Sequence, residues 1–245
     1  MINFYRRLRK KLAVDNKHRQ YARYAIGGIV LVVIGILIAL QINNWNQGRL
    51  QRIEEMKMLK SLKSEFSKNL IKFDLNIKEQ MDRNHIIERL LHPEVTNLPF
   101  ESLDSLVYYL GWNFKFNPST GIYNSIVNSG KIEILNNDSL KIAISNFNNY
   151  LVDFEEEEIG ANNYGTNYLT PYLRSQLNYR YPFKNRTKAQ YKYDDDNYRD
   201  VIASDRTRNE LIFYWSYLLI TLEKGQELRN EIVRIINMIE KELQD

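Results

Sequence analysis

Four acidic and histidine side chains near the middle of the chain could bind a metal ion. They are Asp82, His85, Glu88 and His92. Steps of three, three and four residues place them along one face of a helix, where imidazoles and carboxylates could ligate zinc or iron. However, Pro93 should end that helix directly after His92, and the interleaved Arg83 and Arg89 are typical of a solvated face. We therefore expect no bound metal or cofactor, and keep His85, Glu88 and His92 only as metal candidates.

Two acidic runs could also bind cations. The run from Asp153 to Glu158 is interrupted only by Phe154 and could collect cations or bind a basic partner. A solvated helix surface is the favoured interpretation of such a run. A second group, from Asp194 to Asp196 with Asp200, lacks the spacing and the glycine of a calcium-binding loop.

Tyrosine is unusually common, with 17 residues. Tyr164, Tyr168 and Tyr172 recur every four residues, and further tyrosines follow in a less regular segment; these are Tyr179, Tyr181, Tyr191, Tyr193 and Tyr198. Exposed tyrosines would form a platform for a peptide or a sugar, since each combines a flat apolar ring with a polar group. We expect burial instead, because the first three share the spacing of a core stripe.

No recognisable catalytic motif is present. The sequence lacks the Gly-x-x-x-x-Gly-Lys phosphate loop, the Gly-x-Ser-x-Gly elbow and the His-Glu-x-x-His zinc motif. It also has no cysteine, which excludes disulfides, thiol nucleophiles and cysteine metal sites. We therefore predict no catalytic residues and no enzyme.

The N-terminal part contains a predicted membrane span. Residues 24–48 carry no charged side chain, and residues 25–40 are only Ala, Ile, Gly, Val and Leu. As a helix, residues 25–42 would be about 27 Å long, which is enough to cross a bilayer. A cleaved signal peptide is the alternative, but the 24 preceding residues are long for one and no cleavage site follows. We predict an uncleaved signal anchor.

Charge predicts the orientation of this span. Residues 1–24 hold eight Lys and Arg against one acidic residue, so they should stay in the cytoplasm. Arg19 and Arg23 on one side and Trp45 on the other should lie at the membrane interfaces. The tail is either a short interfacial helix or a disordered basic stub. Residues 25–245 have 26 basic and 29 acidic residues, so we expect no nucleic-acid binding.

Small residues in the span could mediate self-association. Gly28, Gly35 and Ala39 fall on one helical face, and Gly35 with Ala39 forms a small-x-x-x-small pair that permits close approach of two helices. A homodimer through this face is therefore possible, and the same pattern also occurs in spans that remain monomeric.

Hydrophobic spacing predicts two long helices beyond the span. The first stripe follows an eleven-residue repeat and consists of Leu59, Leu62, Phe66, Leu70, Phe73, Ile77 and Met81. This period predicts a helix over residues 50–91, which could continue the membrane helix with a weak point at Gly48. A second stripe predicts a helix from Asp205, as its N-cap, to about Leu243. Helices of this length should pair antiparallel.

The segment between these helices should contain shorter ones. Prolines open predicted helices over residues 100–110 and 118–130, and a turn over 131–137 follows. Asp138 should cap a third long helix, which Pro171 kinks or ends. We interpret residues 160–200, rich in Asn and Tyr, as a loop or hairpin.

These elements define the fold class. We predict an all-α protein with a single N-terminal transmembrane helix and an extracytoplasmic helical bundle built on two or three long antiparallel helices, with some coiled-coil character. Its divisions are a cytoplasmic tail (1–24), a transmembrane helix (25–42) and one all-α domain (43–245).

Two segments resemble a known family. The stretch from Tyr24 to Asn46, apart from Gly28, and the stretch from Ile122 to Glu133 are similar to signatures of domain of unknown function 6090, a family of single-span Gram-negative envelope proteins. The resemblance implies a bacterial inner-membrane protein with a periplasmic domain, and it implies no activity or catalytic residues.

We therefore expect a protein that contacts the lipid bilayer and acts through a protein partner in the envelope, as a scaffold, an accessory subunit or a sensor-like module. The alternative is a periplasmic ligand- or metal-binding domain.

Overall fold

The computed structural model describes residues 2–177 and 195–244, with side chains for residues 19, 21–177 and 197–244. Every regular element in these ranges is a helix, which confirms the all-α prediction. By compactness the chain divides into two units, residues 1–56 and 57–245, which are treated separately below.

The first unit consists of the beginning of helix α1 (Ile2–Leu91). Among the described residues, α1 is the one helix that is long and apolar enough to cross a membrane, and its apolar stretch is fully exposed. The helix continues without a break through Gly48, which confirms that the long helix continues the apolar one, and the weak point at that glycine stays a prediction. A single glycine lowers helix propensity by only about 1 kcal/mol, which the flanking turns easily offset.

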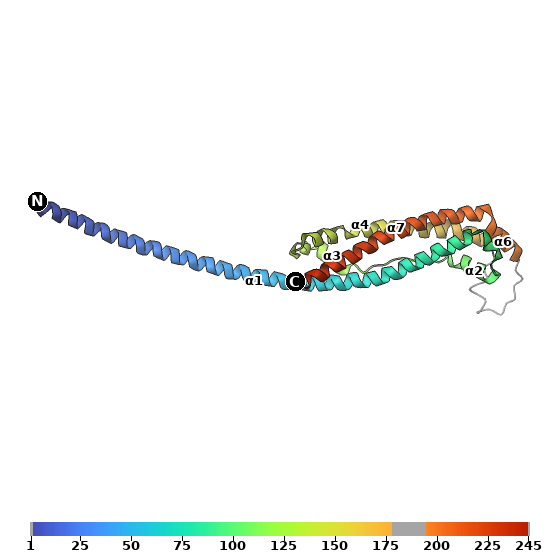
Figure 1. The fold of residues 1–245 in the computed structure, drawn as a ribbon, viewed down its shortest axis with the longest axis horizontal. Coiled ribbons are helices and arrows are strands. Elements are labelled where there is room, and N and C mark those ends of the chain that lie inside the picture. The colour runs from blue at the N-terminus through green and yellow to red at the C-terminus, as the bar shows by residue number, and fades with distance from the viewer. Residues whose placement is uncertain (1, 178–194, 245) are drawn as a thin grey trace. The chain divides into compact units, whose positions relative to one another are not determined.

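The second unit is built on three long helices: the end of α1, α4 (Asp138–Tyr164) and α7 (Asp205–Glu242) (Figure 1). The predicted boundaries at Leu91 and Asp205 are confirmed. The side chains of α1 and α7 pair in opposite order along the chain. Lys63 Nζ lies 2.9 Å from Glu240 Oε1, and Arg229 Nε lies 2.7 Å from Asp74 Oδ1. The two helices are therefore antiparallel.

Helix α4 completes this group. It runs parallel to α1, because Phe66 and Phe73 of α1 pack edge-on against Phe147 and Phe154 in the same order, with ring centroids 4.8 and 5.0 Å apart. It is antiparallel to α7, since Asn137, which caps α4, donates to Glu242 at 2.7 Å while the hydroxyl of Thr221 donates to the carbonyl of Glu157.

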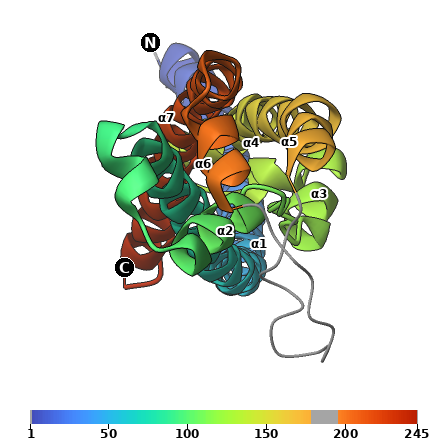
Figure 2. The ribbon, with the colours of Figure 1, turned by 90° about the vertical axis from the view of Figure 1, so that its right-hand side faces the viewer.

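Several shorter helices connect the long ones. They are η1 (Pro93–Asn97), α2 (Phe100–Tyr109), α3 (Gly121–Asn128), η2 (Lys131–Ile134), the π-helical turn η3 (Gly165–Leu169), α5 (Thr170–Gln176) and α6 (Asp195–Ala203). At one end of the domain α6 contacts α2 through a hydrogen bond from Tyr198 to Asp104, and Arg199 donates to the carbonyl of Leu98 after η1 (Figure 2).

Both predicted aspartate caps are shifted by one residue. Asn137 and Ser204 are the N-caps, and their side chains accept from the backbone N–H of Leu140 and Thr207. A cap needs an extended backbone and an oxygen within reach of the third helical N–H, and both residues meet this requirement. The aspartates follow in the first helical turn, where the helix dipole favours their charge. Helix α3 likewise begins at Gly121, three residues after Pro118.

The predicted loop or hairpin over residues 160–200 is wrong where the structure describes it. Helix continues from α4 through η3 and α5 to Gln176, and α6 begins at Asp195. The π-helical turn directly precedes the first turn of α5, where Pro171 lies. The π-helical turn changes the backbone hydrogen-bond pattern directly before Pro171, which has no N–H to donate. The proline therefore does not end the helix.

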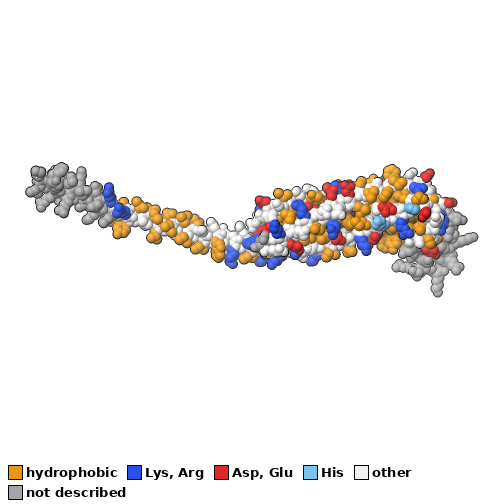
Figure 3. All heavy atoms as spheres, viewed as in Figure 1, with side chains coloured by type: hydrophobic (Ala, Val, Ile, Leu, Met, Phe, Trp, Pro, Cys, Tyr) orange, Lys and Arg blue, Asp and Glu red, His pale blue; other side chains and the backbone are white. Residues whose placement is uncertain are grey.

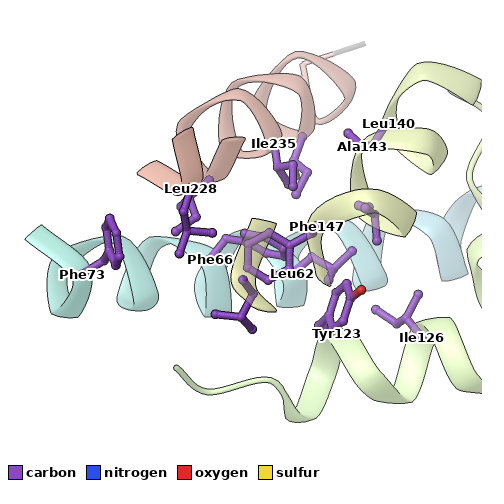
Figure 4. Packing of buried hydrophobic residues seen from close by; sticks show 14 of the residues in the cluster. Leu62, Phe66, Phe73, Tyr123, Ile126, Leu140, Ala143, Phe147, Leu228 and Ile235 are labelled. Carbon is purple, nitrogen blue, oxygen red and sulfur yellow. The ribbon is translucent and has the colours of Figure 1, made fainter. Parts of the chain in front are cut away.

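Two apolar clusters form the core of this unit. The first joins α1 up to Ile77 with α3, α4 and the C-terminal half of α7 (Figure 4). The second joins α1 from Ile87 with α2, α5, α6 and the N-terminal half of α7. The intervening part of α1 contributes no buried hydrophobic residue. The interior there is polar.

Gly225 marks the tightest packing between α7 and its neighbours. A Cβ at this position would lie 2.5 Å from Ile77 Cδ1 and 3.4 Å from a ring carbon of Phe154. We expect Gly225→Leu to destabilise the domain by about 1–3 kcal/mol, because the core cannot hold a larger side chain. The matched change Gly160→Leu, where a Cβ meets only the Tyr217 ring at 3.7 Å, should be neutral or stabilising. Thermal unfolding of the intact chain in detergent, followed by circular dichroism, measures both. Equal loss of stability in the two variants would contradict this packing.

Candidate functional site

A layer of polar side chains separates the two apolar clusters. Gln80, Arg83 and Glu158 are each at most 2% exposed, and Asn76 is also buried. Arg83 was predicted to lie on a solvated face, and that prediction is wrong. Met81, predicted in the core, is 47% exposed, because the inward stripe of α1 continues through Gln80, Arg83 and Ile87 instead. Buried polar groups of this kind must find hydrogen-bond partners or destabilise the fold.

Glu158 on α4 binds a backbone group of a segment that has no helix of its own. Both carboxylate oxygens accept from the N–H of Phe116, at 3.1 and 3.0 Å, and one also accepts from Asn76 Nδ2 at 2.8 Å. Burial raises the pKa of the Glu158 carboxyl, and these hydrogen bonds oppose that rise. Glu158 therefore differs from the rest of its acidic run, which lies on the surface of α4 as expected.

Arg83 on α1 binds the same segment. Its guanidinium donates to the carbonyl of Trp112 and lies over the ring of Phe114, 4.8 Å from the centroid. The ring of Tyr214 on α7 is 5.7 Å away. Burial lowers the pKa of Arg83, opposed by Tyr214 and by the charge of Glu158. Within the described residues, two guanidinium nitrogens of Arg83 and the Tyr214 hydroxyl make no hydrogen bond.

This segment, residues 112–120, connects α2 to α3 without helix or strand, and Phe116 is its one buried residue. Asn69 on α1 pairs with Ser119 through both its amide atoms, donating to the carbonyl at 2.7 Å and accepting from the N–H at 2.8 Å. Asn162 on α4 donates to the carbonyl of Phe114 at 2.8 Å. Glu65 accepts from the first N–H groups of α3, at Ile122 and Tyr123. The buried polar side chains are thus used largely to hold this segment.

The three metal candidates line one groove but do not form a metal-binding cluster. His85 Nδ1 lies 3.2 Å from Glu88 Oε2, and both side chains are exposed. His92 Nδ1 accepts from the N–H of Glu94 and so caps η1. No group of three His, Asp or Glu side chains in the described residues is arranged to hold a metal ion. The three candidates do line a groove of about 630 Å³ with Val95 and Leu98.

An exposed aromatic surface lies between α4 and α7. We call it the aromatic face and define it as Tyr164, Tyr168, Phe213 and Tyr217. The ring of Tyr164 stacks on Tyr168 with centroids 5.4 Å apart, and it lies 5.4 Å from Tyr217 and 6.5 Å from Phe213. Tyr168 and Phe213 are 63% and 62% exposed. The hydroxyl of Tyr164 donates to Glu210 at 2.9 Å, and burial together with this carboxylate raises its pKa.

The predicted burial of the tyrosines therefore holds only in part. Tyr168 is exposed, Tyr164 and Tyr172 are half-buried, and Tyr198 is buried in the second cluster. Each of the first three tyrosines directly precedes a buried residue, Gly165, Leu169 or Leu173, so these tyrosines lie beside the core stripe and not on it. Tyr179, Tyr181, Tyr191 and Tyr193 lie outside the described residues, as do the side chains of Asp194, Asp195 and Asp196.

The residues predicted to pack the membrane helix or to lie at the membrane interface are exposed within the first unit, residues 1–56. Arg19, Arg23, Ala39 and Trp45 are all solvent-exposed, and no atom lies within 4 Å of a Cβ built at Gly28 or Gly35. Their roles in helix packing and at the membrane interface stay predictions.

Residues 28–155 match the model of a family described as "Family of unknown function (DUF6090)". The matched part begins in the apolar stretch of α1 and ends within the acidic run of α4. Comparison of the chain with curated proteins and with solved structures finds no match.

The contacts of Glu158 predict a specific pH dependence. Because its folded-state pKa is raised, the folded protein keeps this proton at a higher pH than the unfolded chain does. The resulting stabilisation is fully present below the unfolded pKa and is lost as the pH rises through the folded pKa. The permanently neutral Glu158→Gln should therefore flatten the stability profile in the window above the ordinary glutamate pKa.

The alanine variant separates charge from hydrogen bonding. We expect Glu158→Ala to lower the free energy of unfolding by about 2–4 kcal/mol at any pH, since it leaves the Phe116 N–H and the Asn76 amide unpaired. Urea unfolding of the intact chain in detergent, repeated at fixed steps between about pH 4 and pH 8, gives the free energy of unfolding of both variants. A glutamine variant as unstable as the alanine variant would show that the charge itself is needed.

The two histidines of the groove should be dispensable for folding. Replacing His85 and His92 together with Gln should change the free energy of unfolding by no more than about 1 kcal/mol, because His85 is exposed and His92 caps only a short turn. Elemental analysis of the purified wild-type chain should find zinc and iron at background. Stoichiometric metal that is lost in the double variant would restore the metal site.

Proposed function

We propose that this chain, which belongs to the DUF6090 family of unknown function, is a membrane-anchored protein whose helical domain acts by binding another protein. The observation that carries the proposal is the aromatic face of α4, η3 and α7. Tyrosine and phenylalanine are enriched in protein interfaces, and exposed apolar patches on a folded domain mark sites of interaction. A scaffold, an accessory subunit or a sensor-like module of an envelope assembly would use such a surface.

The interior of the domain supports the same proposal. Its buried carboxylates, amides and guanidinium bind the segment 112–120 and the start of α3. Glu158 and Asn69 are therefore occupied by the fold itself, whereas both amide atoms of Gln80 and two guanidinium nitrogens of Arg83 make no hydrogen bond within the described residues.

For the location, we propose the bacterial inner membrane, with the N-terminus in the cytoplasm and the domain in the periplasm. The apolar stretch of α1 supports a single span, and the basic residues before position 24 support this orientation.

A second candidate function is ligand binding in the groove lined by His85, Glu88 and His92. Its volume of about 630 Å³ lies within the usual range for small-molecule sites. A thermal-shift screen of the purified chain against metals, peptides and glycans tests it, since a specific ligand raises the melting temperature.

The proposed topology predicts the behaviour of reporter fusions. Alkaline phosphatase, which is active only outside the cytoplasm, should be active when fused after Asp245. A cytoplasm-only reporter at the same position should be inactive, because eight basic residues hold the N-terminus inside. The opposite pattern would overturn both the orientation and the periplasmic location.

The proposed binding function predicts a partner that depends on the domain. The intact chain, crosslinked in its native membrane and purified, should retain a protein in stoichiometric amount, identified by quantitative mass spectrometry. A matched chain of residues 1–56 serves as the control, since it keeps the first compact unit and lacks the domain. Retention of the same protein by this control, or no stoichiometric protein at all, would contradict the proposal.

A further inference from the structure

The aromatic face continues along α7 as an exposed apolar stripe. Phe213, Tyr217 and Ile220 follow at steps of four and three residues, so they share one side of the helix, and all three are exposed. Gly160 of α4 lies beside Tyr217 and carries no side chain to cover it. Since a Cβ there would make only an ordinary contact at 3.7 Å, internal packing does not require this glycine. The surface between α4 and α7 is therefore open to a partner at this point.

Carboxylates border the aromatic face at both ends. At one end Glu210 accepts the hydrogen bond of Tyr164. At the other, the carbonyl of Glu157 accepts from Thr221 of α7, which places the acidic run of α4 beside the apolar stripe. Of that run, Asp153 and Glu156 are exposed, and Glu155 and Glu157 are half-buried. Figure 3 shows acidic side chains gathered beside a hydrophobic area over these helices.

Lys224 on α7 compensates this run only in part. Its ion pair is with Glu227 of its own helix, at 3.0 Å, and Asp153 is among the carboxylates, led by Glu227, that raise its pKa. One lysine therefore faces more carboxylates than it can neutralise. The surface thus combines tyrosine rings, an aliphatic side chain and an excess of carboxylates. Such a surface is complementary to a helix with Leu or Phe on one face and Lys or Arg beside it, through apolar burial, ion pairs and cation–π contacts.

We propose that the aromatic face and the adjoining acidic residues of α4 bind a basic amphipathic helix of another protein. This inference rests on the proposed function and names the chemistry of the partner. A second copy of the chain fits less well, because a symmetric contact through this surface would bring two acidic runs together and like charges would repel.

Binding to a defined probe tests the proposal. The intact chain is placed in nanodiscs of zwitterionic phosphatidylcholine, and empty nanodiscs are measured in parallel to subtract lipid binding. The probe is a synthetic amphipathic helical peptide with leucine on one face and lysine on the other, and its counterpart carries glutamate in place of lysine. Fluorescence anisotropy gives the dissociation constants at two salt concentrations. We expect the lysine peptide to bind, more weakly at high salt, and the glutamate peptide not to bind.

Variants locate the site. Phe213→Ser with Tyr217→Ser should weaken binding of the lysine peptide at least about 10-fold, the effect of removing interface anchors. Glu156→Gln with Glu157→Gln should weaken it and reduce its salt dependence. Gly160→Leu, which adds a side chain instead of removing one, should weaken it as well. Ile71→Ser with Leu75→Ser is the control, because both residues are exposed to a similar extent on α1, and it should bind as the wild type does.

Each remaining outcome contradicts the inference. These outcomes are equal binding of the two peptides, no binding of the lysine peptide, wild-type binding by the Phe213 and Tyr217 variant or by Gly160→Leu, and an equal loss in the control. Sedimentation that shows a dimer abolished by the Phe213 and Tyr217 changes would assign the surface to a second copy. If the variant with Phe213→Ser and Tyr217→Ser still retains a native partner, the proposed function stands and this site is refuted. If the intact chain retains no partner at all, the proposed function is refuted.

Discussion

The hydrogen bonding of the segment 112–120 is the constraint on which the domain depends. This segment belongs to no helix. Most of its side chains are exposed, but Phe116 is buried, and the backbone groups that face α1 and α4 need partners. Three long helices have no free backbone groups to offer along their length, so side chains must supply them. Asn69, Arg83, Glu158 and Asn162 do so, from α1 and α4. The polar layer between the two apolar clusters follows directly from this requirement.

The same requirement shapes where function can lie. Arg83 and Glu158 are buried and charged, as catalytic or ligand-binding residues often are. Here they bind the backbone of the chain itself, at Trp112 and Phe116. The exterior carries the aromatic face, in which Tyr164 stacks on Tyr168 and lies beside Phe213 and Tyr217 of α7.

Much of the fold could be predicted from the sequence, because long periodic stripes determine long helices. The ends at Leu91 and Asp205, the antiparallel pairing and the short helix after Pro99 all follow from spacing and helix-end signals. The polar interior could not be predicted in this way. Spacing placed Met81 inside and Arg83 outside, whereas the structure reverses them. The signal was present, since Asn69, Asn76, Gln80 and Arg83 keep helical spacing with Phe73 and Ile87, but a hydrophobic pattern ignores polar members of a stripe. Tyr168 was misplaced because the buried stripe runs through Gly165, Leu169 and Leu173, each of which directly follows a tyrosine.

Hydrogen exchange at this segment tests the central claim most directly. In the intact chain in detergent, the amide hydrogens of Phe116, Ser119, Ile122 and Tyr123 should exchange as slowly as those in the middle of α4. They lie outside a helix or in its first turn, where amides are ordinarily unprotected, and here side-chain carboxylates and an amide accept from them. Exchange of these four amides at the rate of an unstructured peptide would show that the buried polar side chains do not hold the segment, and would contradict this account of the domain.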